Sequence, residues 1–201
     1  MNTQVSSLTK LILASGSQGR RELMTRAGYV FTVQPADIFE PTEAADGDIR
    51  HYVAELAWRK AAAVAATVTD TAIVIAADTV GWINGHVVGK PDDEAHARRI
   101  LAELGGTVHE LWTGVCLWHR PSGLQLCWQE VSRVRMTKLS EAELDDYLRT
   151  RKWVGCSGAY ALQMPTDPYL SVIEGSTSNV IGLPMETLAL RLAWLNERVL
   201  V

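Results

Sequence analysis

Residues 11–21 read LILASGSQGRR, and the fold is built outward from this stretch. The apolar start predicts a buried strand, the Ser and Gly residues a tight loop, and the arginines the start of a helix. Such a loop presents backbone N–H groups to an anion, and the helix dipole favours negative charge there. Ser15 and Ser17 can add hydroxyls, and Arg20 or Arg21 a bidentate clamp, so the stretch predicts a phosphate site. The alternative is an ordinary connecting loop, which is the commoner case.

The composition limits the domain number, the binding partners and the cell compartment that can be expected. The chain has 201 residues, 47% of them hydrophobic, which suits one domain or two small lobes that share a sheet. Its net charge of −4 gives no electrostatic case for binding nucleic acid or an anionic membrane. No apolar run is long enough to span a membrane, and the first ten residues lack a signal-peptide core. The three cysteines have no metal-ligand spacing, so a reduced, cytoplasmic protein is expected.

A long helix is predicted from an N-cap at Asp48 to about Val68. Its apolar residues recur at helical spacing, and Lys60 falls on the same stripe whereas Arg59 does not. A lysine on the core-facing side must either reach solvent with its ammonium group or meet an anion. The first outcome is the commoner one, and a phosphate partner is favoured only if other basic groups converge there.

Two carboxylates stand out beside this helix. Residues 71–77 form a continuous apolar run that predicts a strand buried on both faces, and Asp78 follows it directly. Strand-like residues resume at 80–83, so Asp78 is expected within the sheet or at its lip, which favours function over a turn cap. Glu40 lies in an acidic loop over residues 35–47, just after another strand. The other carboxylates of that loop are expected to be solvated.

The remaining patterns predict alternating strands and helices. Strands are expected at 29–34, 86–88, 109–118, 124–136, 159–163 and 169–173, and helices at 20–27, 92–104, 140–150 and 185–198. Cys116 and Cys127 would face each other if the hairpin turns at residues 121–122. His109 and His119 lack partners at ligand spacing and are expected to be structural. Lys90, between Gly and Pro, is either a surface lysine or another cation for the site, and Gln163 either reads a base edge or satisfies backbone groups.

The candidate residues form a set that suits nucleotide chemistry. Arg20 and the lysines neutralise a polyphosphate, and Glu40 with Asp78 can hold Mg²⁺, which also bridges substrate phosphates. Water activated by Asp78 or by the metal can then attack phosphorus. The set fits hydrolysis of a nucleotide pyrophosphate bond without being unique to it.

Several short motifs in order give the chain a resemblance to a known family. They are ASGS with Arg20, DIFE at residues 37–40, AWRKA at 57–61, ADTV at 77–80, GKP at 89–91, Gly106 with His109, TGV at 113–115, GAY at 158–160 with Gln163, and GLP at 182–184. Each is weak alone, but together they are specific, and the chain resembles the Maf family of nucleoside triphosphate pyrophosphatases over nearly its whole length.

The resemblance implies an elongated, two-lobed α/β fold around a mixed central sheet, similar to inosine triphosphate pyrophosphatases. Residues 1–201 would form a single domain with a cleft between the lobes. The implied activity is hydrolysis of nucleoside triphosphates to a monophosphate and pyrophosphate, with Mg²⁺ or Mn²⁺ as the divalent metal. Family members often form dimers, so a homodimer is a further expectation.

The resemblance also assigns roles to residues. It implies Asp78 as the proton acceptor and a metal ligand, with Glu40 also near the metal. It places Ser15, Arg20, Lys60 and Lys90 around the phosphates. These assignments are completed by Thr79 and Gln163, which are expected near the base.

Two departures from the family pattern bear on the substrate. Gly19 stands where members of the dTTP/UTP type carry the first arginine of Pro-Arg-Arg, so Gly19, Thr79 and Gln163 are the expected specificity positions. Cys156 replaces a common lysine and is more similar to the 7-methyl-GTP branch, whereas Thr79, Tyr160 and Gln163 are similar to the dTTP/UTP branch. The expected substrates are dTTP, UTP or modified pyrimidine nucleotides. The alternatives are a 7-methyl-GTP pyrophosphatase, a phosphatase that removes the terminal phosphate, and a non-catalytic, nucleotide-sensing regulator of cell division.

Overall fold

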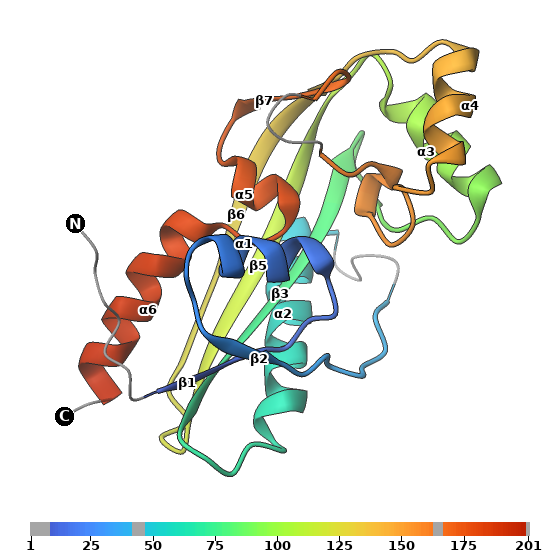
Figure 1. The fold of residues 1–201 in the computed structure, drawn as a ribbon. Helices are drawn as coiled ribbons and strands as arrows, with labels where there is room; N and C mark the ends of the chain where they lie inside the picture. Colours follow the sequence, from blue (N-terminus) through green and yellow to red (C-terminus); the bar gives the residue numbers. More distant parts are fainter. Residues whose placement is uncertain (1–8, 42–46, 163–166, 200–201) are drawn as a thin grey trace.

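The computed structural model describes residues 9–41, 47–162 and 167–199. Among these residues, seven strands form one mixed sheet in the order β2-β1-β3-β5-β6-β7, and β4 pairs with β3 (Figure 1). The strands are β1 (Lys10–Leu13), β2 (Phe31–Val33), β3 (Ala72–Ile83), β4 (His86–Val88), β5 (Val108–Arg120), β6 (Gln125–Met136) and β7 (Leu170–Glu174). β1 runs parallel to β2 and β3, and the other pairs are antiparallel.

The helices divide between the two faces and the two ends of this sheet. They are α1 (Gln18–Arg26), α2 (Ile49–Ala65), α3 (Glu94–Leu104), α4 (Glu141–Arg149), α5 (Thr177–Ile181) and α6 (Met185–Val199), with a short 3₁₀ helix η1 (Ser157–Ala159). α2 covers one face of β3 and β5, whereas α1 and α6 cover the opposite face. The apolar stripe of α2 is buried as predicted, and the side chain of Asp48 caps the helix by accepting from the Arg50 N–H.

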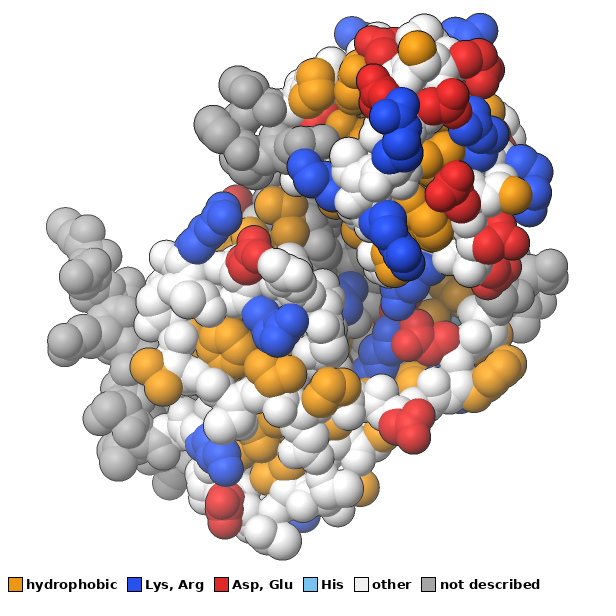
Figure 2. All heavy atoms as spheres, turned by 45° about the vertical axis from the view of Figure 1, so that its right-hand side comes forward, with side chains coloured by type: hydrophobic (Ala, Val, Ile, Leu, Met, Phe, Trp, Pro, Cys, Tyr) orange, Lys and Arg blue, Asp and Glu red, His pale blue; other side chains and the backbone are white. Residues whose placement is uncertain are grey.

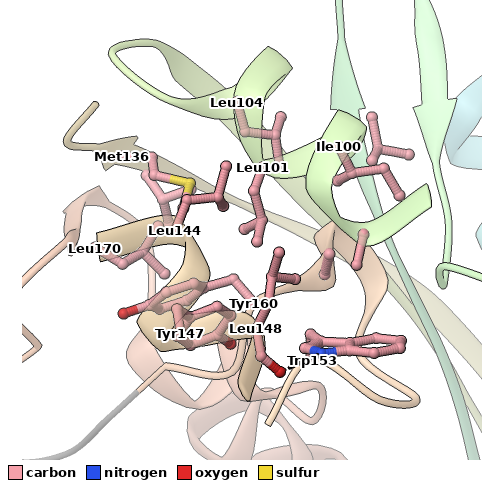
Figure 3. Close-up of a cluster of buried hydrophobic side chains, with 14 of the residues drawn as sticks. Ile100, Leu101, Leu104, Met136, Leu144, Tyr147, Leu148, Trp153, Tyr160 and Leu170 are labelled. Atoms are coloured by element: carbon pink, nitrogen blue, oxygen red, sulfur yellow. Dashed lines mark hydrogen bonds between the residues drawn. The ribbon is translucent and has the colours of Figure 1, made fainter. Parts of the chain in front are cut away.

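The other end of the sheet carries a second lobe. There α3, α4 and β7 enclose a separate apolar core that includes Leu101, Leu148 and Met136 (Figure 3). Tyr147 and Tyr160 stack within it, with ring centroids 4.6 Å apart. β3, β5 and β6 run the length of the molecule and belong to both lobes (Figure 1). The predicted α/β fold with two lobes on a mixed sheet is therefore confirmed.

Most of the predicted elements are confirmed, including the opposition of Cys116 and Cys127 across β5 and β6. The strand predicted over residues 159–163 is wrong for its described part. Ala159 ends η1 with a φ of +55°, and the Ala161 N–H donates to the Tyr147 hydroxyl at 3.1 Å rather than to a strand. No helix was predicted between residues 173 and 185, where the structure contains the short helix α5, which the side chain of Ser176 caps. Over the described residues, the structure contains no helix with the length and apolar character that crossing a bilayer requires.

Candidate active site

The loop after β1 caps α1 with its own serine hydroxyls and borders a cleft. Ser17 is the N-cap of α1, and its hydroxyl accepts a hydrogen bond from the Arg20 N–H at 3.4 Å. Ser15 is buried, and its hydroxyl accepts from the Ser17 N–H at 3.3 Å. The whole loop from Ala14 to Arg20 lines a cleft, so the start of the helix dipole faces the cleft as the sequence predicted.

Arg20 connects this loop to two distant parts of the chain. Its guanidinium donates to Ser15 Oγ at 3.0 Å, to Thr79 Oγ1 at 3.0 Å and to the Gly182 carbonyl at 2.7 Å. Burial lowers the pKa of Arg20, and the negative charges of Asp78 and Glu40 partly offset this effect. Arg20 therefore lies within the field of both carboxylates, whereas Arg21 is exposed on the surface of α1.

Lys60 brings the two predicted carboxylates together. Its Nζ lies 2.6 Å from Asp78 Oδ1 and 3.0 Å from Glu40 Oε2. Lys60 and Asp78 are buried, with 6% and 5% of their surfaces exposed, whereas the Glu40 side chain keeps 39% exposure. The second oxygen, Asp78 Oδ2, is buried without a hydrogen-bond partner in the described structure. A buried carboxylate oxygen left unpaired is costly, so this atom is suited to a bound water, metal or substrate group.

The register of the sheet explains why Asp78 and Thr79 have different surroundings. Asp78 pairs with Gly114 of β5 and points to the face covered by α2, where Lys60 lies. Thr79 pairs with Thr113 and points to the opposite face, where its hydroxyl meets Arg20 and lies 2.9 Å from Thr113 Oγ1. Adjacent residues of one strand thus supply a carboxylate and a hydroxyl to the same cleft.

The second lobe supplies the opposite wall of the cleft. Lys90 is exposed and lines the cleft, and its charge partly opposes the rise that burial causes in the pKa of Cys156. The Ser157 hydroxyl donates to the Thr79 carbonyl at 2.7 Å, and the Gly158 N–H donates to the Gly89 carbonyl at 3.0 Å. The first bond attaches the 156–158 segment to β3, the strand that carries Asp78, and the second attaches it to the residue before Lys90.

The cleft between the lobes has a volume of about 990 Å³. Figure 2 shows it as a hollow between two masses, with lysine and arginine side chains along its walls. One part holds the basic and acidic groups described above, and another is lined by apolar side chains, among them Leu104, Leu111, Met136, Leu162 and Leu170. A cleft with a charged part and an apolar part is suited to a ligand that carries phosphates at one end and a base at the other.

Gly19 also lines the cleft, at the point where the chain departs from the family pattern. A Cβ atom at this position would lie 2.9 Å from Ile181 Cγ2 and 3.3 Å from the Ile181 carbonyl oxygen. Ile181, the last residue of α5, thus occupies part of the space that a side chain at residue 19 would need. Gln163 lies outside the described residues, and its predicted place near a base stays a prediction.

The structure brings Ser15, Arg20, Glu40, Lys60, Asp78, Thr79 and Lys90 to one cleft. Two further residues, His109 and Tyr52, had no functional role in the sequence-based expectations. His109 was expected to be structural, but it lines the cleft, and burial lowers its pKa to about 4. His109 alternates with Leu111 and Thr113 along β5, so the strand period places all three side chains on the same face of the sheet. This alternation is the signal that could have located His109 from the sequence. Tyr52 is buried on the apolar stripe of α2, and its hydroxyl donates to the Pro41 carbonyl.

The donor set bears on metal binding. Among the described residues, no group of three or more His, Cys, Asp and Glu side chains is arranged to hold a metal ion. The available protein donors are the carboxylates of Glu40 and Asp78, including the unpaired Asp78 Oδ2. One or two carboxylates with waters and substrate phosphates is the usual environment of Mg²⁺, so the donors fit an ion that is completed by substrate.

Comparison with curated proteins identifies relatives along most of the chain. A dTTP/UTP pyrophosphatase of Rhodopirellula baltica is 43% identical over 89% of this chain and 79% of its own length. A dTTP/UTP pyrophosphatase of Anaeromyxobacter sp. is 40% identical, with 88% of this chain and 84% of its own length covered. One from Clostridium novyi is 35% identical, with 89% and 94% covered.

The comparisons extend to solved structures and to families. A nucleoside-triphosphatase/dITP/XTP pyrophosphatase of Mycobacterium abscessus aligns with 96% of this chain and 99% of its own, with 13% identity and a TM-score of 0.40. The model of the Maf-like protein family matches residues 10–195. This range includes the cleft residues Ser15, Arg20, Glu40, Lys60, Asp78, Thr79 and Lys90. The match to the family model and the identity with the curated relatives show that this chain belongs to the Maf-like protein family.

Proposed function

We propose that this protein hydrolyses nucleoside triphosphates to a nucleoside monophosphate and pyrophosphate, with dTTP, UTP or modified pyrimidine nucleotides as its substrates. The observation that carries the proposal is the cluster of Lys60, Asp78 and Glu40 beside the anion loop and Arg20. The names of the family relatives support the same reaction and the same bases.

In the proposed mechanism, the basic groups hold the phosphates. The N–H groups of the loop before α1, the hydroxyl of Ser15 and the cations of Arg20, Lys60 and Lys90 bind phosphate oxygens. Lys90 reaches them from the opposite lobe, so the triphosphate would bridge the cleft. Thr79, Gly19 and Gln163 are proposed to act on the choice of base, as the family resemblance implies.

Asp78 is the proposed proton acceptor. A water molecule forms a bond to the α-phosphorus, the bond from that phosphorus to the bridging oxygen breaks, and pyrophosphate leaves with the electron pair. The water proton passes to the Asp78 carboxylate, whose Oδ2 has no partner in the described structure. Asp78 is buried and paired with Lys60, so its carboxylate has a fixed place in the cleft.

We further propose that Glu40 and Asp78 hold Mg²⁺ or Mn²⁺. The ion supplies positive charge that neutralises phosphate oxygens when it is bound. In the described structure Lys60 pairs with both carboxylates, and its one positive charge leaves the cluster with a net negative charge that a divalent ion could offset. Binding of the ion would then free the ammonium group of Lys60 for the phosphates.

Cytoplasmic location is also part of the proposal. Nucleoside triphosphates are made there, and the three cysteines are free thiols, as a reducing compartment allows. A homodimer stays a prediction, which sedimentation of the purified protein tests.

Pyrophosphate release and the role of Asp78 as proton acceptor can be tested with the purified protein. Purified protein with Mg²⁺ or Mn²⁺ should release pyrophosphate from at least one of dTTP, UTP, CTP, 5-methyl or pseudouridine triphosphates and 7-methyl-GTP. Asp78→Asn should lower the rate by about 100-fold or more because it removes the base and one negative ligand. Asp70→Asn is the matched control, because the Asp70 side chain is 73% exposed and pairs only with Lys10 among described residues.

The products separate the alternatives. Release of orthophosphate instead of pyrophosphate would assign a terminal phosphatase, and a preference for 7-methyl-GTP would assign the other branch suggested by Cys156. Nucleotide binding without turnover across the panel would contradict the proposal and support a nucleotide-sensing role.

A further inference from the structure

Glu40 reaches the cleft from a segment with little support of its own. The chain leaves β2 at Val33, and residues 34–41 form neither helix nor strand. Ile38 is half-buried, but Phe39, directly before Glu40, is 78% exposed and does not anchor Glu40. The ion pair of Glu40 with Lys60 would be weakened once Lys60 turns to a phosphate. Something else must then keep the Glu40 carboxylate in the cleft.

Tyr52 provides that support. It lies on α2, two turns before Lys60, and only 8% of its surface is exposed. Its hydroxyl donates a hydrogen bond of 2.5 Å to the carbonyl of Pro41, the residue that follows Glu40. Burial and the negative charges of Asp78 and Glu40 raise the pKa of Tyr52 to about 12, so the hydroxyl keeps its proton at neutral pH and can donate.

The position of this bond makes it effective. The pyrrolidine ring fixes φ of Pro41, and a residue before proline is restricted to extended backbone. Two of the torsions around Glu40 are therefore already limited by sequence. A single hydrogen bond to the Pro41 carbonyl, given by a buried side chain on a long helix, then fixes the direction in which Glu40 leaves the backbone.

We propose that Tyr52 is a positioning residue that holds Glu40 in the cleft, in readiness for a divalent cation, through its hydrogen bond to the Pro41 carbonyl. The inference rests on the proposed function for its metal, but its structural part does not. Tyr52 touches neither substrate nor ion in this scheme and acts only through Glu40.

The test is Tyr52→Phe, which removes the hydroxyl and keeps the ring in the core. Tyr169→Phe is the matched control, because it removes a hydroxyl bonded to the carboxylate of Glu143 at 3.2 Å, in the second lobe. Three measurements are made on each protein: NMR order parameters of the amides of residues 38–40 without metal, Mn²⁺ affinity by electron paramagnetic resonance, and the kinetics of pyrophosphate release.

We expect the order parameters of residues 38–40 to fall in Tyr52→Phe, from values near those of rigid backbone to below about 0.6, and to stay unchanged in Tyr169→Phe. The Kd for Mn²⁺ alone should rise about two- to tenfold, the change expected for one hydrogen bond. In the kinetics, the metal concentration for half-maximal activity should rise by the same factor while KM for the nucleotide stays constant. In the Glu40→Gln background, Tyr52→Phe should have no further effect on Mn²⁺ affinity.

Unchanged order parameters in Tyr52→Phe would overturn the proposal, whatever the kinetics. So would a Tyr52 effect of the same size in the Glu40→Gln background, since the hydroxyl would then act elsewhere. Failure of the proposed function has a different signature: the wild-type protein releases no pyrophosphate from any nucleotide, while the order parameters still distinguish Tyr52→Phe from its control.

Discussion

At the scale of single residues, the buried His109 makes the stability of the fold depend on pH. Its imidazole is buried on β5, and burial lowers its pKa to about 4, whereas a histidine in an unfolded chain titrates near 6.5. The unfolded chain therefore takes up the proton first as the pH falls. The stability that neutral His109 allows is complete above about pH 6.5 and is lost as the pH falls towards 4.

We predict that His109→Gln flattens the pH dependence of stability. Between pH 7 and 4, the free energy of unfolding of the wild type should fall by on the order of 3 kcal/mol more than that of the variant. Urea unfolding at several pH values measures this difference. His119 also has a pKa lowered by burial, but it is present in both proteins and cancels in the comparison. Curves that stay parallel over the whole range would contradict the prediction.

The residues that could be predicted from sequence are those whose place follows from periodicity. Lys60 was expected on the buried stripe of α2 and Asp78 within a central strand, and both are found there. The partners of Arg20 could not be predicted, because Gly182 and Thr79 lie 162 and 59 residues away along the chain. Tyr52 was missed because a tyrosine on an apolar stripe gives no sign of what its hydroxyl meets.

At the scale of elements, the distance between α2 and the sheet depends on Gly114. A Cβ atom on this residue would lie 2.1 Å from the Val53 carbonyl oxygen of α2, which is far closer than any contact allows. Gly114 is the partner of Asp78 in the register, so the same close approach lets Lys60 of α2 reach Asp78. The glycine thus positions a helix and, through it, an ion pair.

We predict that Gly114→Ala lowers the free energy of unfolding by about 2–3 kcal/mol or more, because α2 must move outward. The rate of pyrophosphate release should fall as well, since Lys60 moves with the helix. Gly89→Ala is the control for stability, because a Cβ there meets no atom within 4 Å, and it should change stability by less than about 0.5 kcal/mol. Equal stability of the two variants in chemical denaturation would refute this account.

Elements with a long, regular pattern were predicted correctly, and those set by tertiary contacts were not. The helix expected at residues 140–150 is found as α4, which begins with a capping box of Ser140 and Glu143. The strand expected at residues 86–88 is found as β4, which pairs with β3. The apolar residues at 159–162 gave a strand pattern, but Ala159 lies in the 3₁₀ helix η1 and the Ala161 N–H donates to the Tyr147 hydroxyl. The strand was therefore overridden by contacts with α4 that no local pattern contains.

At the scale of the whole molecule, the two lobes are built on the same strands. β3 and β5 pair continuously from Ala72 opposite Arg120 to Trp82 opposite Glu110, and β5 and β6 pair over almost the same length. Separating the lobes would break these ladders in their middle. A mixed sheet with helices on both faces could be predicted from sequence, but the order of its strands could not. An alternating apolar pattern predicts a strand without specifying which strands pair with it.

We predict that the chain unfolds in a single cooperative transition, as a single domain over residues 1–201 requires. In scanning calorimetry the calorimetric enthalpy should equal the van't Hoff enthalpy within error. Two resolved transitions, or a van't Hoff enthalpy near half the calorimetric value, would show instead that the lobes are separate folding units.

The continuity of β3, β5 and β6 also has a mechanical consequence. These strands pass between the lobes without a break, so a change in the width of the cleft must bend or twist the sheet rather than swing one lobe about a linker. Such bending would act on the inter-strand hydrogen bonds of β3, β5 and β6 together. A ligand that needs a different cleft width would therefore have to deform the sheet itself or rely on the side chains that line the cleft.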